Sequence, residues 1–255
     1  GEIKVRHSDF PRFLRLLGIV YRPAGRLGGF GLSAKAKGDF SKISFDAISG
    51  RIGPVPVNGS LSVDLGGKLP QLNGAMNTGR IVIEDFLPAK RSASLAPAIR
   101  PAIRPAIRKA SFSGAIVPVA LADKEHRWPT EKIDLSFLQA FDGEMKLVSE
   151  ALVYDGVELA KSVLNATLAG GILRANSLTG ELFGGRLKGI ATAYSAPVPR
   201  LKGSISLANA DFAKAEQTYR GASAATGKMN FRMTFDASGR SVAHLIAGLN
   251  GEGSA

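Results

Sequence analysis

The 255-residue sequence contains no cysteine, which excludes disulfide bonds, thiol catalysis and every zinc or iron–sulfur site that needs a thiolate. Its only histidines, His7, His126 and His244, lie far apart and lack the spacing of a metal-binding motif. No run of about 18 apolar residues occurs, so we expect no membrane-spanning helix. We therefore expect no metal and no cofactor.

Signatures of catalysis are also missing. There is no P-loop and no G-x-S-x-G elbow, and the chain has no convincing nucleophile with a neighbouring base. Residues 29–34 match the dinucleotide-binding pattern only loosely, because strand-like alternation follows where a helix is required. We predict a protein that is not an enzyme, with a pair of carboxylates assembled only by the fold as the alternative left open.

Aromatic residues are scarce, at 7% of the chain, whereas glycine is abundant, with 30 residues. This combination favours strands and tight turns over helical bundles. The formal net charge of +12 indicates an anionic partner, for which nucleic acid and anionic lipid both qualify.

Apolar residues alternate with polar ones in many short segments, as in strands with one buried and one wet face. The alternating sets are Leu61, Val63, Leu65; Ile81, Ile83; Ile133, Leu135, Phe137; Met145, Leu147; Ile205, Leu207; and Met229, Phe231, Met233, Phe235. The dipeptides Asn58-Gly59, Asn73-Gly74, Asp142-Gly143 and Asp155-Gly156 favour hairpin turns. The predicted fold class is mainly β: a curled antiparallel sheet, or sheets, of repeated hairpins with an apolar inner face and a few short helices.

Three short helices are expected. The first follows Asp9 and carries Phe10 and Phe13, the second runs over residues 212–219, and the third runs over residues 241–249. Each is short enough to be a connector that packs on a sheet.

A long-range repeat links the two halves of the chain. Residues 50–52 and 58–60 correspond to residues 180–182 and 188–190, and Pro-x-Leu-x-Gly occurs at both 70–74 and 199–203. We interpret this as two stacked copies of one β unit. Between them, Pro-Ala-Ile-Arg occurs three times, which excludes an α-helix there. The predicted division is an N-terminal β unit over residues 1–89, a Pro- and Arg-rich linker over 90–110 and a C-terminal β unit over 111–255.

A curled sheet would present its alternating apolar residues on the inner face. The candidate lining residues are Leu61, Val63, Ile81, Ile83, Leu147, Leu168, Ile205, Leu207, Phe231 and Phe235. They form a lipid-binding groove if the face is open, and an ordinary core if it is covered. The sequence leaves both interpretations open.

Several segments together resemble the AsmA family of bacterial envelope proteins. They are Trp128-Pro129 leading to residues 133–138, then residues 141–147, the aromatic-Gly-Gly turn of residues 182–189, and Gly239-Arg240-Ser241 with Leu245 and residues 249–251. The resemblance covers about residues 128–255 well and the N-terminal half more loosely.

The resemblance implies a β-rich periplasmic protein that takes part in outer-membrane biogenesis. It also implies a tether to the inner membrane through a segment upstream of this chain, and a lipid-carrying trough like that of the larger TamB-type relatives. The family offers no catalytic residues to carry over.

Three functions follow as hypotheses. The first is a lipid-binding or lipid-transfer protein whose partners are a phospholipid or other membrane lipid and the inner-membrane surface. The second is an assembly factor that contacts an outer-membrane partner through a sheet edge. The third, a nucleic-acid-binding module, is disfavoured because the strand faces lack aromatic stacking residues; we expect no nucleic-acid partner.

Overall fold

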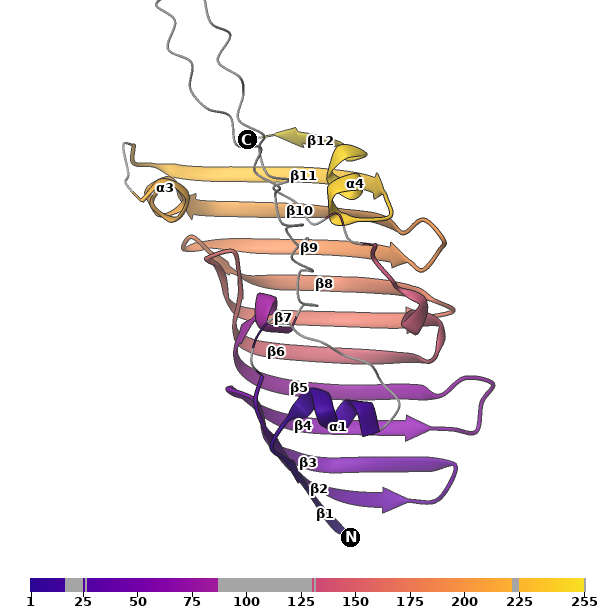
Figure 1. The fold of residues 1–255 in the computed structure, drawn as a ribbon. Helices are drawn as coiled ribbons and strands as arrows, with labels where there is room; N and C mark the ends of the chain where they lie inside the picture. Colours follow the sequence, from indigo (N-terminus) through magenta and orange to yellow (C-terminus); the bar gives the residue numbers. More distant parts are fainter. Residues whose placement is uncertain (17–24, 26, 87–129, 131, 222–224, 255) are drawn as a thin grey trace, which may run out of the picture.

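The computed structural model describes residues 1–16, 25, 27–86, 130, 132–221 and 225–254. They form one open sheet of twelve strands, which lie side by side in chain order (Figure 1). The strands are β1 Glu2–His7, β2 Phe30–Gly38, β3 Lys42–Ile52, β4 Val55–Asp64, β5 Gln71–Val82, β6 Asp142–Tyr154, β7 Val157–Ala169, β8 Ile172–Leu182, β9 Gly185–Tyr194, β10 Arg200–Asp211, β11 Lys228–Ser238 and β12 Asn250–Ser254. Neighbouring strands are antiparallel, except that β5 and β6 are parallel. The mainly β, mostly antiparallel prediction is confirmed.

The three predicted helices are also present, as α1 Phe10–Leu16, α3 Phe212–Arg220 and α4 Val242–Ala247. Each begins where a polar side chain accepts a backbone N–H of the first turn. Asp9 Oδ1 accepts from Arg12 N at 2.8 Å, Asp211 Oδ1 from Lys214 N at 3.3 Å, and Ser241 Oγ from His244 N at 3.2 Å. These side chains satisfy donors that the helix itself cannot pair, which fixes the start of each connector.

Some local predictions are wrong. Of the four predicted turn dipeptides, only Asp155-Gly156 makes a hairpin turn, between β6 and β7, with φ of 49° and 75°. Asn58-Gly59 and Asn73-Gly74 lie inside β4 and β5, and Asp142-Gly143 begins β6. Residues 133–137, predicted as a strand, are irregular chain over 133–135 and then enter a short 3₁₀ helix, η1 Ser136–Gln139.

The sheet has one apolar and one polar face, because side chains alternate along each strand and directly paired residues share a face. One lateral row of paired residues crosses ten strands; we call it the central row. Its members are Ile48, Gly59, Met76, Leu147, Leu164, Leu178, Gly189, Ile205, Met233 and Gly253. The face that carries this row is called the apolar face here, and the opposite one the polar face.

The repeat seen in the sequence recurs in the strands. β3 and β8 begin 130 residues apart, as do β4 and β9, while β5 and β10 begin 129 apart. Both copies carry the same register shift, between Phe45 and Ile48 on β3 and between Ala175 and Leu178 on β8. All these strands belong to a single sheet. The predicted linker, residues 90–110, lies outside the described residues, so the three-part division stays a prediction.

A cluster of buried apolar residues lies at one end of β9 and β10 on the apolar face. Leu187, Leu207 and Ala210 are buried there, and Ala210 is fully inaccessible to solvent. The packed neighbours come from β7, β8, β10 and β11 and from the turn after β8; they are Leu159, Leu178, Leu182, Phe183, Ile205 and Met229. Helix α3 follows directly on β10 at this end of the sheet (Figure 1).

Candidate functional site

The register places most of the ten candidate lining residues on the apolar face. Leu147 and Ile205 belong to the central row. Six others fall in the neighbouring rows of the same face: Leu61, Val63, Leu168, Leu207, Phe231 and Phe235. Residues that are far apart in the sequence are thus joined into one surface by strand pairing.

The two remaining candidates differ from each other. Ile81 belongs to a row of paired residues that leads to the buried cluster around Leu207. It pairs with Leu152, Leu152 pairs with Leu159, and Leu159 packs against that cluster. Ile83 does not continue this strand. It begins the short helix α2, Ile83–Phe86, so its prediction as a strand residue is wrong.

Exposure varies across the candidates. Leu168 and Leu207 are buried, whereas Leu61, Leu147 and Ile205 are half-buried. Phe231 is 37% exposed. The apolar face therefore combines a closed patch near Leu207 with stretches that solvent still reaches.

The polar face carries a separate feature, a hollow of about 910 Å³ over one end of β8–β12. Its side chains come from alternate strand positions: Glu181, Arg186, Lys188, Ser206, Asn230 and Arg232. Leu207 and Phe231 also line it, and since their paired side chains lie on the apolar face, they contribute backbone to its floor. We call this feature the basic hollow.

A β-bulge shapes the rim of the basic hollow. The register between β10 and β11 shifts between Leu207 and Ala210, and Asn209 within this shift has a left-handed backbone, with φ of 57°. Asn230 Oδ1 accepts the Asn209 N–H at 3.0 Å, which fixes the bulge to the neighbouring strand. The bulge therefore holds Asn230 beside the hollow.

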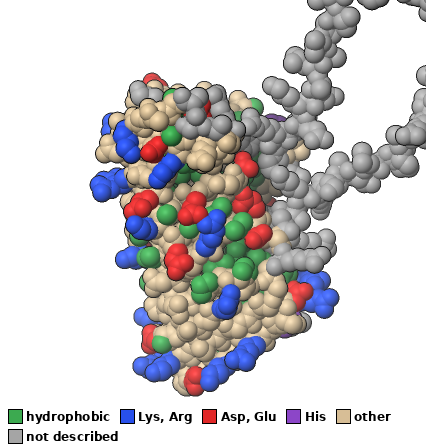
Figure 2. All heavy atoms as spheres, turned by 90° about the vertical axis from the view of Figure 1, so that its left-hand side faces the viewer, with side chains coloured by type: hydrophobic (Ala, Val, Ile, Leu, Met, Phe, Trp, Pro, Cys, Tyr) green, Lys and Arg blue, Asp and Glu red, His purple; other side chains and the backbone are tan. Residues whose placement is uncertain are grey.

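Positive charge dominates the basic hollow. Arg186, Lys188 and Arg232 form no ion pair with any carboxylate that the structure describes. Among the lining residues that the structure describes, the one acidic residue is Glu181, which is paired with Lys161; Lys161 Nζ lies 2.9 Å from Glu181 Oε1. In Figure 2, Lys and Arg side chains lie along the left-hand margin of the molecule from its top to its bottom.

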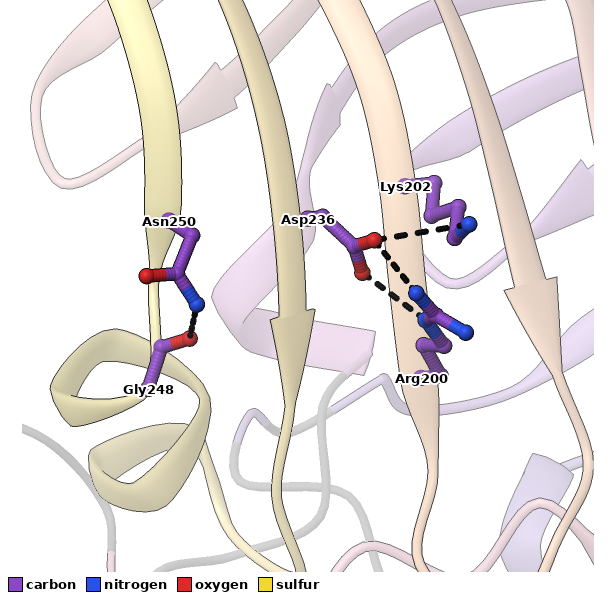
Figure 3. A network of polar contacts seen from close by, with 5 residues as sticks. All are labelled: Arg200, Lys202, Asp236, Gly248 and Asn250. Atoms are coloured by element: carbon purple, nitrogen blue, oxygen red, sulfur yellow. Dashed lines mark hydrogen bonds and ion pairs between the residues drawn. The ribbon is translucent and has the colours of Figure 1, made fainter.

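At the other end of β10 and β11, a carboxylate neutralises the basic side chains. Arg200 and Lys202 of β10 both contact Asp236 of β11, as Figure 3 shows. Hydrogen bonding to the Arg200 guanidinium lowers the pKa of Asp236 from 3.8 to about 2, so this carboxylate stays ionised well into the acidic range. The positive charges at this end are therefore already paired with a carboxylate, whereas those of the basic hollow are not paired with any carboxylate that the structure describes.

The other polar groups fit structural roles. Ser241 Oγ lies 2.8 Å from His244 Nδ1, a distance that suits a nucleophile and its base, but Ser241 is 1% exposed and caps α4. The described residues include no group of three or more metal-binding side chains. Nor does any helix among them have the length and apolarity needed to cross a bilayer.

No protein-family model, curated protein or solved structure matches this chain. Membership of the AsmA family therefore stays a prediction that rests on the quoted residues.

Sequence reasoning missed the basic hollow. Arg186 and Lys188 stand at alternate positions of one strand, which places them on one face, and that signal was readable. Arg232 joins them only through the β9–β10–β11 register, in which Lys188 pairs with Ser206 and Ser206 with Arg232. No local pattern shows that pairing.

Proposed function

We propose that this protein is a non-enzymatic lipid-binding or lipid-transfer protein that holds acyl chains against its apolar face. The observation that carries the proposal is the central row, which is apolar or glycine at every position over ten strands. At a strand spacing of about 4.8 Å, the row is roughly 43 Å long.

The energetics of such a surface suit an acyl chain. Each buried CH₂ group contributes about 0.8 kcal/mol, so half-burying about ten of them contributes about 4 kcal/mol. Half-buried side chains such as Leu147 and Ile205 still have apolar surface to cover. The row gives a chain continuous contact without any polar interruption.

The resemblance to the AsmA family extends this proposal to a place and a process. We infer a bacterial periplasmic protein that is tethered to the inner membrane and supports outer-membrane biogenesis. Its proposed partners are a phospholipid or other membrane lipid and the inner-membrane surface.

The test compares two substitutions at adjacent positions of β6. Leu147→Ser removes an apolar side chain from the central row, whereas Val148→Ser removes a similarly half-buried one from the polar face. We expect Leu147→Ser to reduce extraction of labelled phospholipid from vesicles several-fold and Val148→Ser to leave it near the wild-type value. Equal extraction by both variants and the wild type contradicts the proposal.

The edges of the sheet favour a second candidate, an assembly factor that acts through protein–protein contacts. All five residues of β12 are exposed, and β12 pairs with one strand only among those described. A free edge can accept a strand from a partner. Under this function, purified protein carries no lipid, and deleting residues 250–254 abolishes partner capture while Ile3→Lys on the opposite edge does not.

A further inference from the structure

We propose that the basic hollow on the polar face is a binding site for a phosphate group. The site lies on the face opposite the central row, and the proposal does not depend on acyl chains binding there. Its ligand is a phosphate mono- or diester, carried either by a lipid headgroup or by a soluble compound.

The shape of the basic hollow suits such a ligand. Its volume of about 910 Å³ is within the range of about 300–1,000 Å³ that small-molecule sites occupy. Five strands, β8 to β12, and the turn after β8 contribute to it, so the positions of its side chains are set by the sheet rather than by a single loop. A phosphate group with its attached ester fits this space.

The charges point to an anion. Arg186, Lys188 and Arg232 converge from β9 and β11 on one hollow, and Glu181 is already paired with Lys161. Lys214 of α3 adds a fourth cation at the rim, because its Nζ lies 3.5 Å from where a Cβ on Gly184 would stand. Like charges placed this close repel one another, and a bound phosphate offsets that repulsion.

The side-chain types favour phosphate over a simple carboxylate. A guanidinium offers a planar fork of donors that matches two phosphate oxygens, and two such forks are present, from Arg186 and Arg232. The Ser206 hydroxyl and the Asn230 amide line the same hollow and can donate to a third oxygen. This donor set can surround a tetrahedral anion.

The test uses two double variants of the full chain with equal loss of charge. Lys188→Gln with Arg232→Gln neutralises the basic hollow, while Arg6→Gln with Lys37→Gln removes one Arg and one Lys from the same face on β1 and β2. All four side chains are exposed, so both proteins should fold, and thermal unfolding of each checks this.

The probe is inorganic phosphate, titrated by calorimetry at constant ionic strength. We expect wild-type protein to bind phosphate. The Lys188→Gln/Arg232→Gln protein, called the hollow variant, should bind it about tenfold more weakly or worse, and the Arg6→Gln/Lys37→Gln protein, called the β1–β2 variant, should keep a dissociation constant within about twofold of wild type. Equal weakening of both variants, or no more heat with phosphate than with chloride, overturns the proposal.

Vesicles distinguish the source of the phosphate. The site is assigned to a lipid headgroup if the protein binds phosphatidylcholine–phosphatidylglycerol vesicles, if inorganic phosphate competes this binding away, and if the hollow variant loses it. Phosphate binding without such vesicle binding assigns it to a soluble ester. Leu147→Ser should leave phosphate binding intact, so failure of the lipid proposal and failure of this one give different results.

Discussion

Arg200 and Asp236 form a two-point ion pair across β10 and β11, with Arg200 Nε 2.8 Å from Asp236 Oδ1 and Arg200 Nη2 2.5 Å from Asp236 Oδ2. Lys202 Nζ lies 3.4 Å from the same carboxylate. Because the pair joins two adjacent strands on the polar face, its strength can be measured as a contribution to unfolding.

The Asp236 ion pair predicts an acid-sensitive stability. The pKa of Asp236 falls from 3.8 to about 2 on folding, chiefly through the hydrogen bond from Arg200. Ionised Asp236 therefore stabilises the fold above about pH 3.8, and this contribution is lost as the pH falls through about 2. We expect Asp236→Asn to lower the urea midpoint near neutral pH and to match wild type below about pH 2.

A double-mutant cycle is the control for this prediction. In an Arg200→Gln background, Asp236→Asn should have a clearly smaller effect near neutral pH, because the main partner is gone. An undiminished effect would show that Asp236 acts through some other contact.

Ala210 should not tolerate a larger side chain. It is fully buried against Leu187 and Leu207, so Ala210→Leu forces the cluster apart at a cost of about 1–3 kcal/mol. Ala208→Leu, two residues earlier and exposed, should change the free energy of unfolding by less than about 0.5 kcal/mol. Chemical denaturation of the two variants makes the comparison, and equal losses would contradict the packing described for Ala210.

Two glycines of the apolar face should respond oppositely to alanine. A Cβ on Gly203 would stand 2.4 Å from the Ile190 carbonyl oxygen and 2.6 Å from Phe235 Cζ, so Gly203→Ala should destabilise by about 1–3 kcal/mol. A Cβ on Gly189 meets nothing closer than 3.4 Å, and Gly189→Ala should stabilise by about 0.4–1 kcal/mol. Thermal unfolding of both variants tests the pair, and a loss of similar size at both positions would count against it.

Ser149 ties the parallel strands β5 and β6 together. Ser149 is 1% exposed, and its hydroxyl lies 2.8 Å from the Gly79 carbonyl oxygen and 3.0 Å from that of Ala151. Ser149→Ala should cost about 1–2 kcal/mol of unfolding free energy. Ser162→Ala is the matched control, because Ser162 pairs with Ser149, is 2% exposed and has no side-chain hydrogen bond among the described residues. The control should cost less than Ser149→Ala.

The sequence predicted the strands because period-two alternation survives in almost every one of them. The turn predicted at Asn73-Gly74 is wrong because the sequence alone does not distinguish a glycine inside a strand from a glycine in a turn; the distinction depends on the neighbouring strands. In the sheet, Gly74 makes room: a Cβ there would stand 3.2 Å from both Leu61 Cδ1 and Met145 Cε. Asp155-Gly156 differs in having both residues at positive φ, which only the backbone reveals.

The candidate lining was predictable in part for the same reason. Alternation places Leu61 and Val63 on one face of β4, but it cannot show how strongly packing closes that face near Leu207. The parallel pairing of β5 with β6 was not predictable, because the connection between them is far longer than a hairpin.

The parallel β5–β6 pair also sets the symmetry of the sheet. Equivalent strands of the two copies, such as β4 and β9, are five strands apart, and five antiparallel steps would reverse the strand direction. Because β5 and β6 are parallel, β4 and β9 point in the same direction. The two copies are therefore related by a translation along the twisted sheet, rather than by a twofold rotation. As a result, the bulges after Phe45 and Ala175 fall at the same level, and equivalent apolar side chains stay in register across the molecule.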